Sequence, residues 1–236
     1  IIIIPTFFYI FSYLQFPDQI LSHMVLGSSL GVIVFSSLSS TFSHNFRGAV
    51  DWGLIKLVAP SIVVGSAIGG ITAGALDSDT LQGLVALFLV VASIQLIFEF
   101  PPPPQNPRTN LIGPVLAGGG IGWLSGVFGI GGGIFSVPYF YHRGLLMMKA
   151  IGTSAACGIP IALAGSLSYM IIGYENINLP ENSIGYVYLP ATIIVGLVSS
   201  LTAKYGVKIA HRMKQKKLRI GFAFLVMLMA LNLLMR

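Results

Sequence analysis

Residues 111–141 read LIGPVLAGGGIGWLSGVFGIGGGIFSVPYFY, which is 31 residues (111 to 141 inclusive) without a charged side chain. One crossing of a bilayer takes about 20 apolar residues, so this stretch is too long for a single helix. Its middle, residues 129–133, reads GIGGG, and glycine tolerates the backbone angles of a tight turn. The stretch therefore predicts a helical hairpin with its glycine turn inside the membrane. Whether the two limbs cross fully or re-enter is left open.

The whole chain has the composition of an integral membrane protein. Of its 236 residues, 55% are hydrophobic and 8% are charged, whereas a soluble domain is about 25% charged. The apolar runs are too long for strands and lack the alternation of a β-barrel. We therefore predict an all-α polytopic membrane protein of the plasma membrane, with roughly seven or eight crossings and the lipid bilayer as its solvent.

Glycine, proline and charge divide the chain into apolar segments. We expect helical segments at residues 1–14, 20–43, 54–76, 81–100, 111–141, 149–172, 184–203 and 218–235. The first of these is short, and the 111–141 segment is the hairpin. The sequence begins at Ile1 without a charged leader, so we expect an earlier helical limb, ending in a glycine cluster, to precede it in the full protein.

A proline-rich segment separates two similar halves. Residues 101–110 read PPPPQNPRTN, which predicts a stiff, extended cytoplasmic linker between a first repeat, 1–100, and a second repeat, 111–236. The Gly-Ser-Ser of residues 27–29 has a counterpart in the Gly-Thr-Ser of residues 152–154. Shared landmarks in the same order indicate an internal repeat.

Equivalent connections in the two halves carry opposite charge. Residues 47–56 are mainly basic where their counterpart, 175–181, is acidic, and residues 77–79 are acidic where their counterpart, 204–219, is basic. Because Lys and Arg are retained in the cytoplasm, the halves are predicted to have opposite topology. Each half would be a glycine-broken hairpin followed by three transmembrane helices. The net charge of +6 thus belongs to cytoplasmic loops, and no nucleic-acid partner is expected.

A helix that begins at glycines inside the membrane is a candidate anion site. Its first N–H groups are unpaired and lie at the positive end of the helix dipole. We predict that the substrate is held by these backbone groups and nearby hydroxyls, from Gly129, Gly131, Gly132, Gly133, Ser125, Ser28, Ser29, Thr153 and Ser154. Hydroxyls in membrane helices more often bond a backbone carbonyl, which is the competing interpretation.

Two other groups have predicted roles. His44 and Arg47 lie near a membrane edge and are candidates for gating or substrate access, although as loop anchors they need no function, which is the favoured interpretation. Gly118, Gly122 and Gly126 recur every four residues, a spacing that favours close helix packing.

The sequence resembles a known family at these same residues. SGVFGIGGG at 125–133, Val-Pro at 137–138, Gly-Thr-Ser at 152–154 and HNFRGAVD at 44–51 are similar to the sulfite exporter TauE/SafE family of membrane permeases, and the likeness covers the whole chain. It implies a secondary transporter of small sulfur-containing anions such as sulfite or organosulfonates. With inverted repeats, such a transporter is expected to work by alternating access.

Other classes are less well supported. An anion channel could be lined by the same broken helix. An intramembrane serine hydrolase would need a buried Ser–His pair, so no catalytic residue is assigned and no enzyme is expected. The single cysteine, Cys157, and the absence of a phosphate-binding loop give no reason to expect a metal or cofactor. The substrate, its coupling ion and a homo-oligomeric state are left open.

Overall fold

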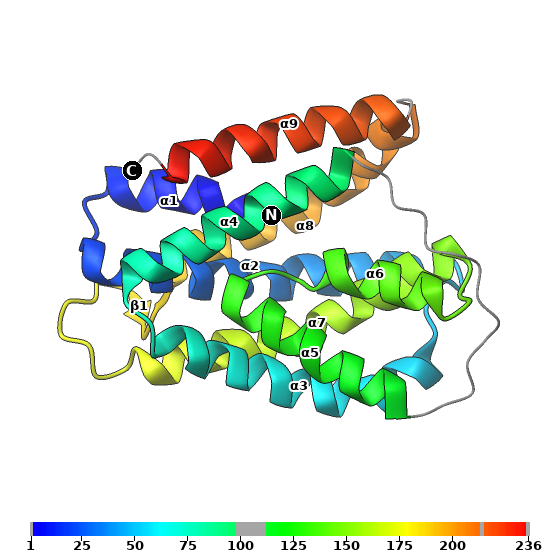
Figure 1. Ribbon diagram of the computed structural model, residues 1–236, viewed down its shortest axis with the longest axis horizontal. Coiled ribbons are helices and arrows are strands. Elements are labelled where there is room, and N and C mark those ends of the chain that lie inside the picture. Colours follow the sequence, from blue (N-terminus) through cyan, green and yellow to red (C-terminus); the bar gives the residue numbers. More distant parts are fainter. Residues whose placement is uncertain (1, 98–111, 213–214, 235–236) are drawn as a thin grey trace.

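The computed structural model describes residues 2–97, 112–212 and 215–234, and across these it is a bundle of long helices that run along one common direction (Figure 1). Its helices are α1 (Ile3–Tyr13), α2 (Asp18–Asn45), α3 (Trp52–Gly74), α4 (Ser78–Ile97), α5 (Ile112–Phe128), α6 (Gly133–His142), α7 (Met147–Ile172), α8 (Leu189–Arg212) and α9 (Gln215–Leu234). The predicted helical class is therefore confirmed. The predicted linker, 101–110, lies outside the described residues.

Among the residues that the structure describes, four helices are long and apolar enough to cross a membrane. They are α2, α3, α4 and α7, and shorter apolar helices occur at 3–13, 112–128 and 189–202. Helix α2 is the most enclosed of the four, with 78% of its most apolar window buried. Its residues 20–32 are all buried. A spanning helix that is covered on all sides by other helices sits at the centre of the bundle, where a transport site would be needed.

The segment predicted as a helix from residue 184 begins differently. Residues Ser183–Ile184 (β1) and Val187–Tyr188 (β2) form a two-stranded antiparallel ladder, and α8 starts only at Leu189. Gly185 has a φ of +52°, the left-handed conformation that a two-residue hairpin turn requires at its first position. The apolar pattern alone could not separate this short hairpin from the helix that follows it.

The glycine hairpin predicted for residues 111–141 is present. Helices α5 and α6 are joined at residues 129–132, and both open toward the end of the molecule that also holds the α2–α3 connection (Figure 1). Gly129 and Gly132 have φ values of +64° and +73°. Helix α6 has 10 residues, or about 15 Å at 1.5 Å per residue. Since a bilayer core is about 30 Å thick, the α6 limb re-enters and does not cross.

The glycines spaced by four on α5 provide the contact with α3. A Cβ on Gly118 would lie 2.6 Å from the Ser61 hydroxyl, and Cβ atoms on Gly122 and Gly126 would run into the backbone of α3. Their predicted packing role is confirmed. Two backbones that approach this closely hold the hairpin in a fixed position against a full-length spanning helix.

The charged side chains that the structure describes are divided between the two ends of the bundle. The connections α2–α3 and α6–α7 lie at one end (Figure 1) and carry Arg47, Asp51 and Arg143, while Lys56 and Lys149 lie near the starts of α3 and α7 at the same end. The connections α1–α2, α3–α4 and α7–β1 lie at the opposite end (Figure 1). Asp77, Glu175 and Glu181 lie in these connections, and Asp18 and Asp79 lie in the first turns of α2 and α4. The side chains of the basic run 204–219 lie outside the described ones.

Candidate functional site

The candidate site is the start of α6, where the glycine turn ends. The Gly132 carbonyl accepts hydrogen bonds from the amides of Phe135 (3.0 Å) and Ser136 (2.8 Å), which closes the first turn of the helix. Within the described chain, the amides of residues 131–134 have no such partner. Free N–H groups at the positive end of a helix dipole attract an anion. Gly132 and Gly133 present them without side chains in the way.

Ser125 lies directly beside this turn. It is fully buried, and its hydroxyl has no hydrogen-bond partner among the described residues. The hydroxyl oxygen is 3.3 Å from the position that a Cβ on Gly132 would occupy, so it faces the turn. A buried polar group without a partner is unfavourable and needs an explanation. A ligand at the turn would supply the missing hydrogen bond.

Ser154 reaches the same turn from α7. Its hydroxyl lies 2.6 Å from that of Ser136, and the Ser136 hydroxyl is 2.9 Å from the Gly132 carbonyl oxygen, to which it donates. Because a hydroxyl has one proton, Ser154 is then the donor to Ser136. Rotation of the Ser154 hydroxyl would redirect that proton toward an anion at the cost of one hydrogen bond. Both side chains are buried.

Ser29 holds the other side of the turn. Its hydroxyl donates to the carbonyl of Gly129 over 2.9 Å. A Cβ on Gly129 would lie 3.0 Å from the Cα of Leu26, and one on Gly131 would lie 3.1 Å from Ile33. The turn therefore packs directly on α2. Three of the predicted hydroxyls, from Ser29, Ser125 and Ser154, are brought together at the predicted glycines.

The other two predicted hydroxyls bond to different backbone groups. The Ser28 hydroxyl accepts from the Tyr188 amide at 2.9 Å, and the Thr153 hydroxyl accepts from the Asp51 amide at 3.0 Å. Both amides directly precede a helix, α8 or α3. These hydrogen bonds fix the starts of those helices. Ser28 and Thr153 therefore bond to backbone amides away from the glycine turn, unlike the three hydroxyls that lie at the turn.

His44 and Arg47 lie where α2 ends. Arg47 is exposed, while His44 is partly buried, with an Nδ1 that has no hydrogen-bond partner among the described groups. Asp51, bonded to Thr153, follows in the same connection. This connection thus contacts α7 within one residue of Ser154. The predicted gating or access role of His44 and Arg47 stays a prediction.

Two residues near the turn were not singled out from the sequence. Ser136 links Gly132 to Ser154, as described above. Tyr169 is fully buried, and its hydroxyl lies 3.3 Å from the Gly126 carbonyl oxygen and 3.4 Å from that of Val127. It thereby satisfies carbonyls at the end of α5, which a helix broken inside a membrane leaves unpaired. Ser136 lies one turn after the glycines, which is the only sequence signal that could have identified it.

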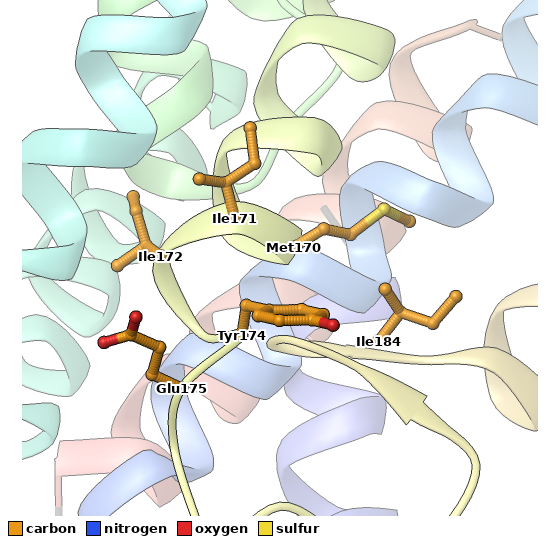
Figure 2. Close-up of a pocket in the computed structure, with 6 residues that line it drawn as sticks. All are labelled: Met170, Ile171, Ile172, Tyr174, Glu175 and Ile184. Carbon is orange, nitrogen blue, oxygen red and sulfur yellow. The ribbon is translucent and has the colours of Figure 1, made fainter.

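A pocket elsewhere has the wrong chemistry for an anion. It has a volume of about 510 Å³ and lies between the end of α7 and the β-hairpin, where Glu175 and Tyr174 face apolar side chains (Figure 2). Its lining residues are Met170, Ile171, Ile172, Tyr174, Glu175 and Ile184. A carboxylate beside a helix C-terminus repels anions. Among the described residues, no group of three or more His, Cys, Asp or Glu could hold a metal ion.

Comparisons with known proteins find similar sequences along the whole chain. The sequence model described as "Sulfite exporter TauE/SafE" matches residues 1–233. A "Probable membrane transporter protein" of Haemophilus influenzae is 30% identical over 241 residues, covering 100% of this chain and 90% of that protein. Another, of Methanocaldococcus jannaschii, is 28% identical over 242 residues, covering 99% and 86%.

A third relative, from Bacillus subtilis and also named a probable membrane transporter protein, is 30% identical over 164 residues, covering 64% of this chain and 65% of that protein. No solved structure matches the chain. The family match spans nearly all of the sequence and both limbs of the glycine hairpin, and the relatives are named probable membrane transporter proteins. The chain belongs to the sulfite exporter TauE/SafE family of membrane transporters.

Proposed function

We propose that this protein is a secondary transporter of small sulfur-containing anions, such as sulfite or an organosulfonate, and that it holds the anion at the glycine turn before α6. The observation that carries the proposal is the Ser125 hydroxyl, which is fully buried, faces Gly132 and has no partner within the described chain. Together with the free amides of residues 131–134, this hydroxyl forms a set of hydrogen-bond donors that have no acceptor within the described chain.

The donors at the turn suit an anion that must be released again. All of them are neutral, because the site is built from amides and the hydroxyls of Ser125 and Ser154. Hydrogen bonds and a helix dipole bind an anion less tightly than a buried Arg or Lys would. Transport requires a site that is favourable enough to fill and weak enough to empty.

Two hydrogen bonds, each of which joins one half of the chain to the other, support the inverted repeats that this proposal includes. Ser28, from the first half, bonds the amide that precedes α8 of the second half. Thr153, its counterpart in the second half, bonds the amide that precedes α3 of the first half. This reciprocity is expected if two repeats, 1–100 and 111–236, are related by a two-fold axis in the membrane plane.

The short helices support the same arrangement. Helix α1 has 11 residues and α6 has 10, and each precedes a long helix that carries a Gly-Ser-Ser or Gly-Thr-Ser motif. Helix α1 begins in the middle of the view and runs toward the end opposite to the one toward which α6 runs (Figure 1). Alternating access would then be a rocking of one repeat against the other about the site.

The proposal is tested by anion flux into liposomes that contain the purified protein. Saturable uptake of sulfite, competed by a short organosulfonate and not by sulfate or chloride, supports a carrier for sulfur anions. Acceleration of uptake by unlabelled substrate on the opposite side separates a carrier from a channel. No flux above empty liposomes, under imposed proton or anion gradients, would contradict the proposal.

Ser125→Ala then tests the site itself. The hydroxyl makes no hydrogen bond within the described chain, so its removal breaks no internal contact and should raise the stability of the fold. If the hydroxyl binds the anion, affinity should fall by about 5- to 30-fold, the loss of one hydrogen bond of about 1–2 kcal/mol. Ser166→Ala is the matched control, because this buried hydroxyl bonds only to Leu163 within α7. An unchanged affinity in Ser125→Ala would remove the hydroxyl from the site.

A further inference from the structure

A groove runs between α3 and α5 on the outside of the bundle. These two helices lie side by side along one edge of the molecule (Figure 1). Residues of α3 from Pro60 to Ile68 line one wall, and residues of α5 from Val115 to Trp123 line the other. The groove has a volume of about 660 Å³, within the range of about 300–1,000 Å³ that is usual for small-molecule pockets. It is therefore large enough to hold a guest.

The lining of the groove suits an apolar guest. The Ser61 hydroxyl is already used, since it donates to the Val58 carbonyl at 2.9 Å. The indole N–H of Trp123 donates to the Thr72 hydroxyl at 3.2 Å. The other lining residues are aliphatic residues and glycines. Because Val64 and other apolar side chains of the walls are exposed, the groove faces the hydrocarbon of the bilayer in a membrane.

The groove is about as long as one leaflet. Helices α3 and α5 run in parallel, because a Cβ on Gly65 would meet Gly119 and one on Gly69 would meet Trp123. From Ile112, where α5 begins, to Trp123 the helix rises by about 17 Å at 1.5 Å per residue. Half of a bilayer core is about 15 Å. The bond from Trp123 to α3 closes the groove at this depth. A spanning helix of a second copy would need a surface through both leaflets, whereas an acyl chain needs only one.

Basic side chains lie where the groove begins, at the end of the bundle that holds the α2–α3 and α6–α7 connections (Figure 1). Lys56 is exposed and precedes Pro60 by one turn of α3, so its long stem can carry the ammonium to the membrane surface. A guanidinium nitrogen of Arg143 lies 3.4 Å from the position of a Cβ on Gly113, in the first turn of α5. The acid at this end, among the described residues, is Asp51, which caps α3. An apolar groove with a basic end complements a lipid with an anionic headgroup.

We propose that the α3–α5 groove binds an acyl chain of an anionic phospholipid from the leaflet at the basic end of the bundle, with the headgroup phosphate held by Lys56 and Arg143. Both side chains donate hydrogen bonds that a phosphate accepts. A chain in the groove contacts α3 and α5 at once, so it strengthens the contact that holds the glycine hairpin. It touches none of the donors at the glycine turn, so the proposal does not depend on the transported anion.

Trp123 provides a direct test, because it is 41% exposed at the deep end of the groove. The chain has two tryptophans, so Trp52→Phe leaves Trp123 as the only indole. This protein is placed in phosphatidylcholine vesicles that contain a small fraction of lipid brominated along its acyl chains, and bromine quenches an indole that it contacts. Brominated phosphatidylglycerol should quench Trp123 more strongly than brominated phosphatidylcholine at the same fraction. Equal quenching by the two lipids would overturn the proposal.

Three further substitutions, made in the Trp52→Phe protein, locate the effect. A Cβ on Gly120 would have nothing within 4 Å, so Gly120→Leu fills the groove without meeting the protein and should remove the preference for phosphatidylglycerol. Gly83→Leu is the matched control, because Gly83 has the same open space on α4. Lys56→Gln should lower the preference by about 5-fold, the effect of one basic group near an anionic membrane surface. A preference that survives Gly120→Leu would contradict the proposal.

The same measurements distinguish a lipid from a second copy of the chain. If two copies met at the α3–α5 groove, Trp123 would be shielded from both brominated lipids, and light scattering of the protein in detergent would give the mass of a dimer. That result would overturn the proposal. All of these experiments are made without substrate, so a failure of the anion proposal leaves them intact.

Discussion

At the scale of single residues, the site depends on groups that the fold leaves incomplete. Ser125 has a hydroxyl without a partner, and the glycine turn has amides without acceptors. Other buried hydroxyls nearby are satisfied, as Ser66 is by the Ile161 carbonyl at 2.8 Å. Unpartnered buried hydroxyls also occur elsewhere, at Ser12, Thr41, Ser183 and Thr192. Ser125 differs from these in that it faces Gly132, where the backbone amides of the turn are free as well.

Gly132 and Gly133 are neighbours that should respond differently to alanine. Gly132 has a φ of +73°, and a Cβ there would lie 2.5 Å from the Ile161 side chain. Gly132→Ala should therefore lose at least about 1–2 kcal/mol of stability from the left-handed backbone alone, plus the overlap. Gly133 has ordinary backbone angles, and its nearest outside atom would be the Ser154 hydroxyl at 3.9 Å. Gly133→Ala should keep the melting temperature and lower anion affinity.

The comparison separates strain from binding. Thermal unfolding in detergent measures the first effect, and anion binding to the folded protein measures the second. If the two variants have the same melting temperature, the left-handed backbone at Gly132 does not set the stability of the turn. If Gly133→Ala binds the anion as the wild type does, the start of α6 is not where the anion lies.

At the scale of elements, α5 holds the re-entrant limb in place through its contact with α3. Gly122 lies against the backbone of Ile62 and Ser66, closer than any side chain would allow. Gly120, two residues earlier, has nothing within 4 Å of its would-be Cβ. The same substitution at these two positions therefore meets either a packed backbone or open space.

Gly122→Ala should separate α3 from α5 and reduce stability by about 1–3 kcal/mol, the usual effect of overpacking. Gly120→Ala should be neutral or stabilising by up to about 1 kcal/mol, because alanine favours a helix over glycine. The melting temperatures of the two variants measure this difference in stability. If Gly122→Ala is as stable as Gly120→Ala, then α3 and α5 can move apart at this contact without loss of stability, which contradicts the prediction.

The elements also show how far sequence reasoning reaches. The glycine turn at 129–133 and the packing role of Gly118, Gly122 and Gly126 were predictable because glycine spacing reports local geometry directly. The β-hairpin at 183–188 was missed because its residues are as apolar as the helix after it. The link from Ser136 to Ser154, and the bonds of Ser28 and Thr153 to amides far along the chain, depend on tertiary contacts that no local pattern encodes.

At the scale of the whole molecule, the two ends differ in charge while the site lies between them. The glycine turn is reached through the hairpin that opens toward the basic end (Figure 1). If Lys and Arg mark the cytoplasmic side, the proposed anion site is approached by a re-entrant limb from inside. The orientation of the bundle thus determines from which side the proposed anion site would be loaded.

That orientation can be measured with two cysteine variants. Phe46→Cys lies at the basic end and Ile177→Cys at the acidic end, and their side chains are 75% and 95% exposed. The native Cys157 is fully buried and gives no background. In intact cells a membrane-impermeant maleimide should label Ile177→Cys and not Phe46→Cys, while both should react once the membrane is permeabilised. Labelling of Phe46→Cys alone would show that the topology is the reverse of the one expected. Labelling of both in intact cells would put the two connections on one side of the membrane, which contradicts a bundle in which they lie at opposite ends (Figure 1).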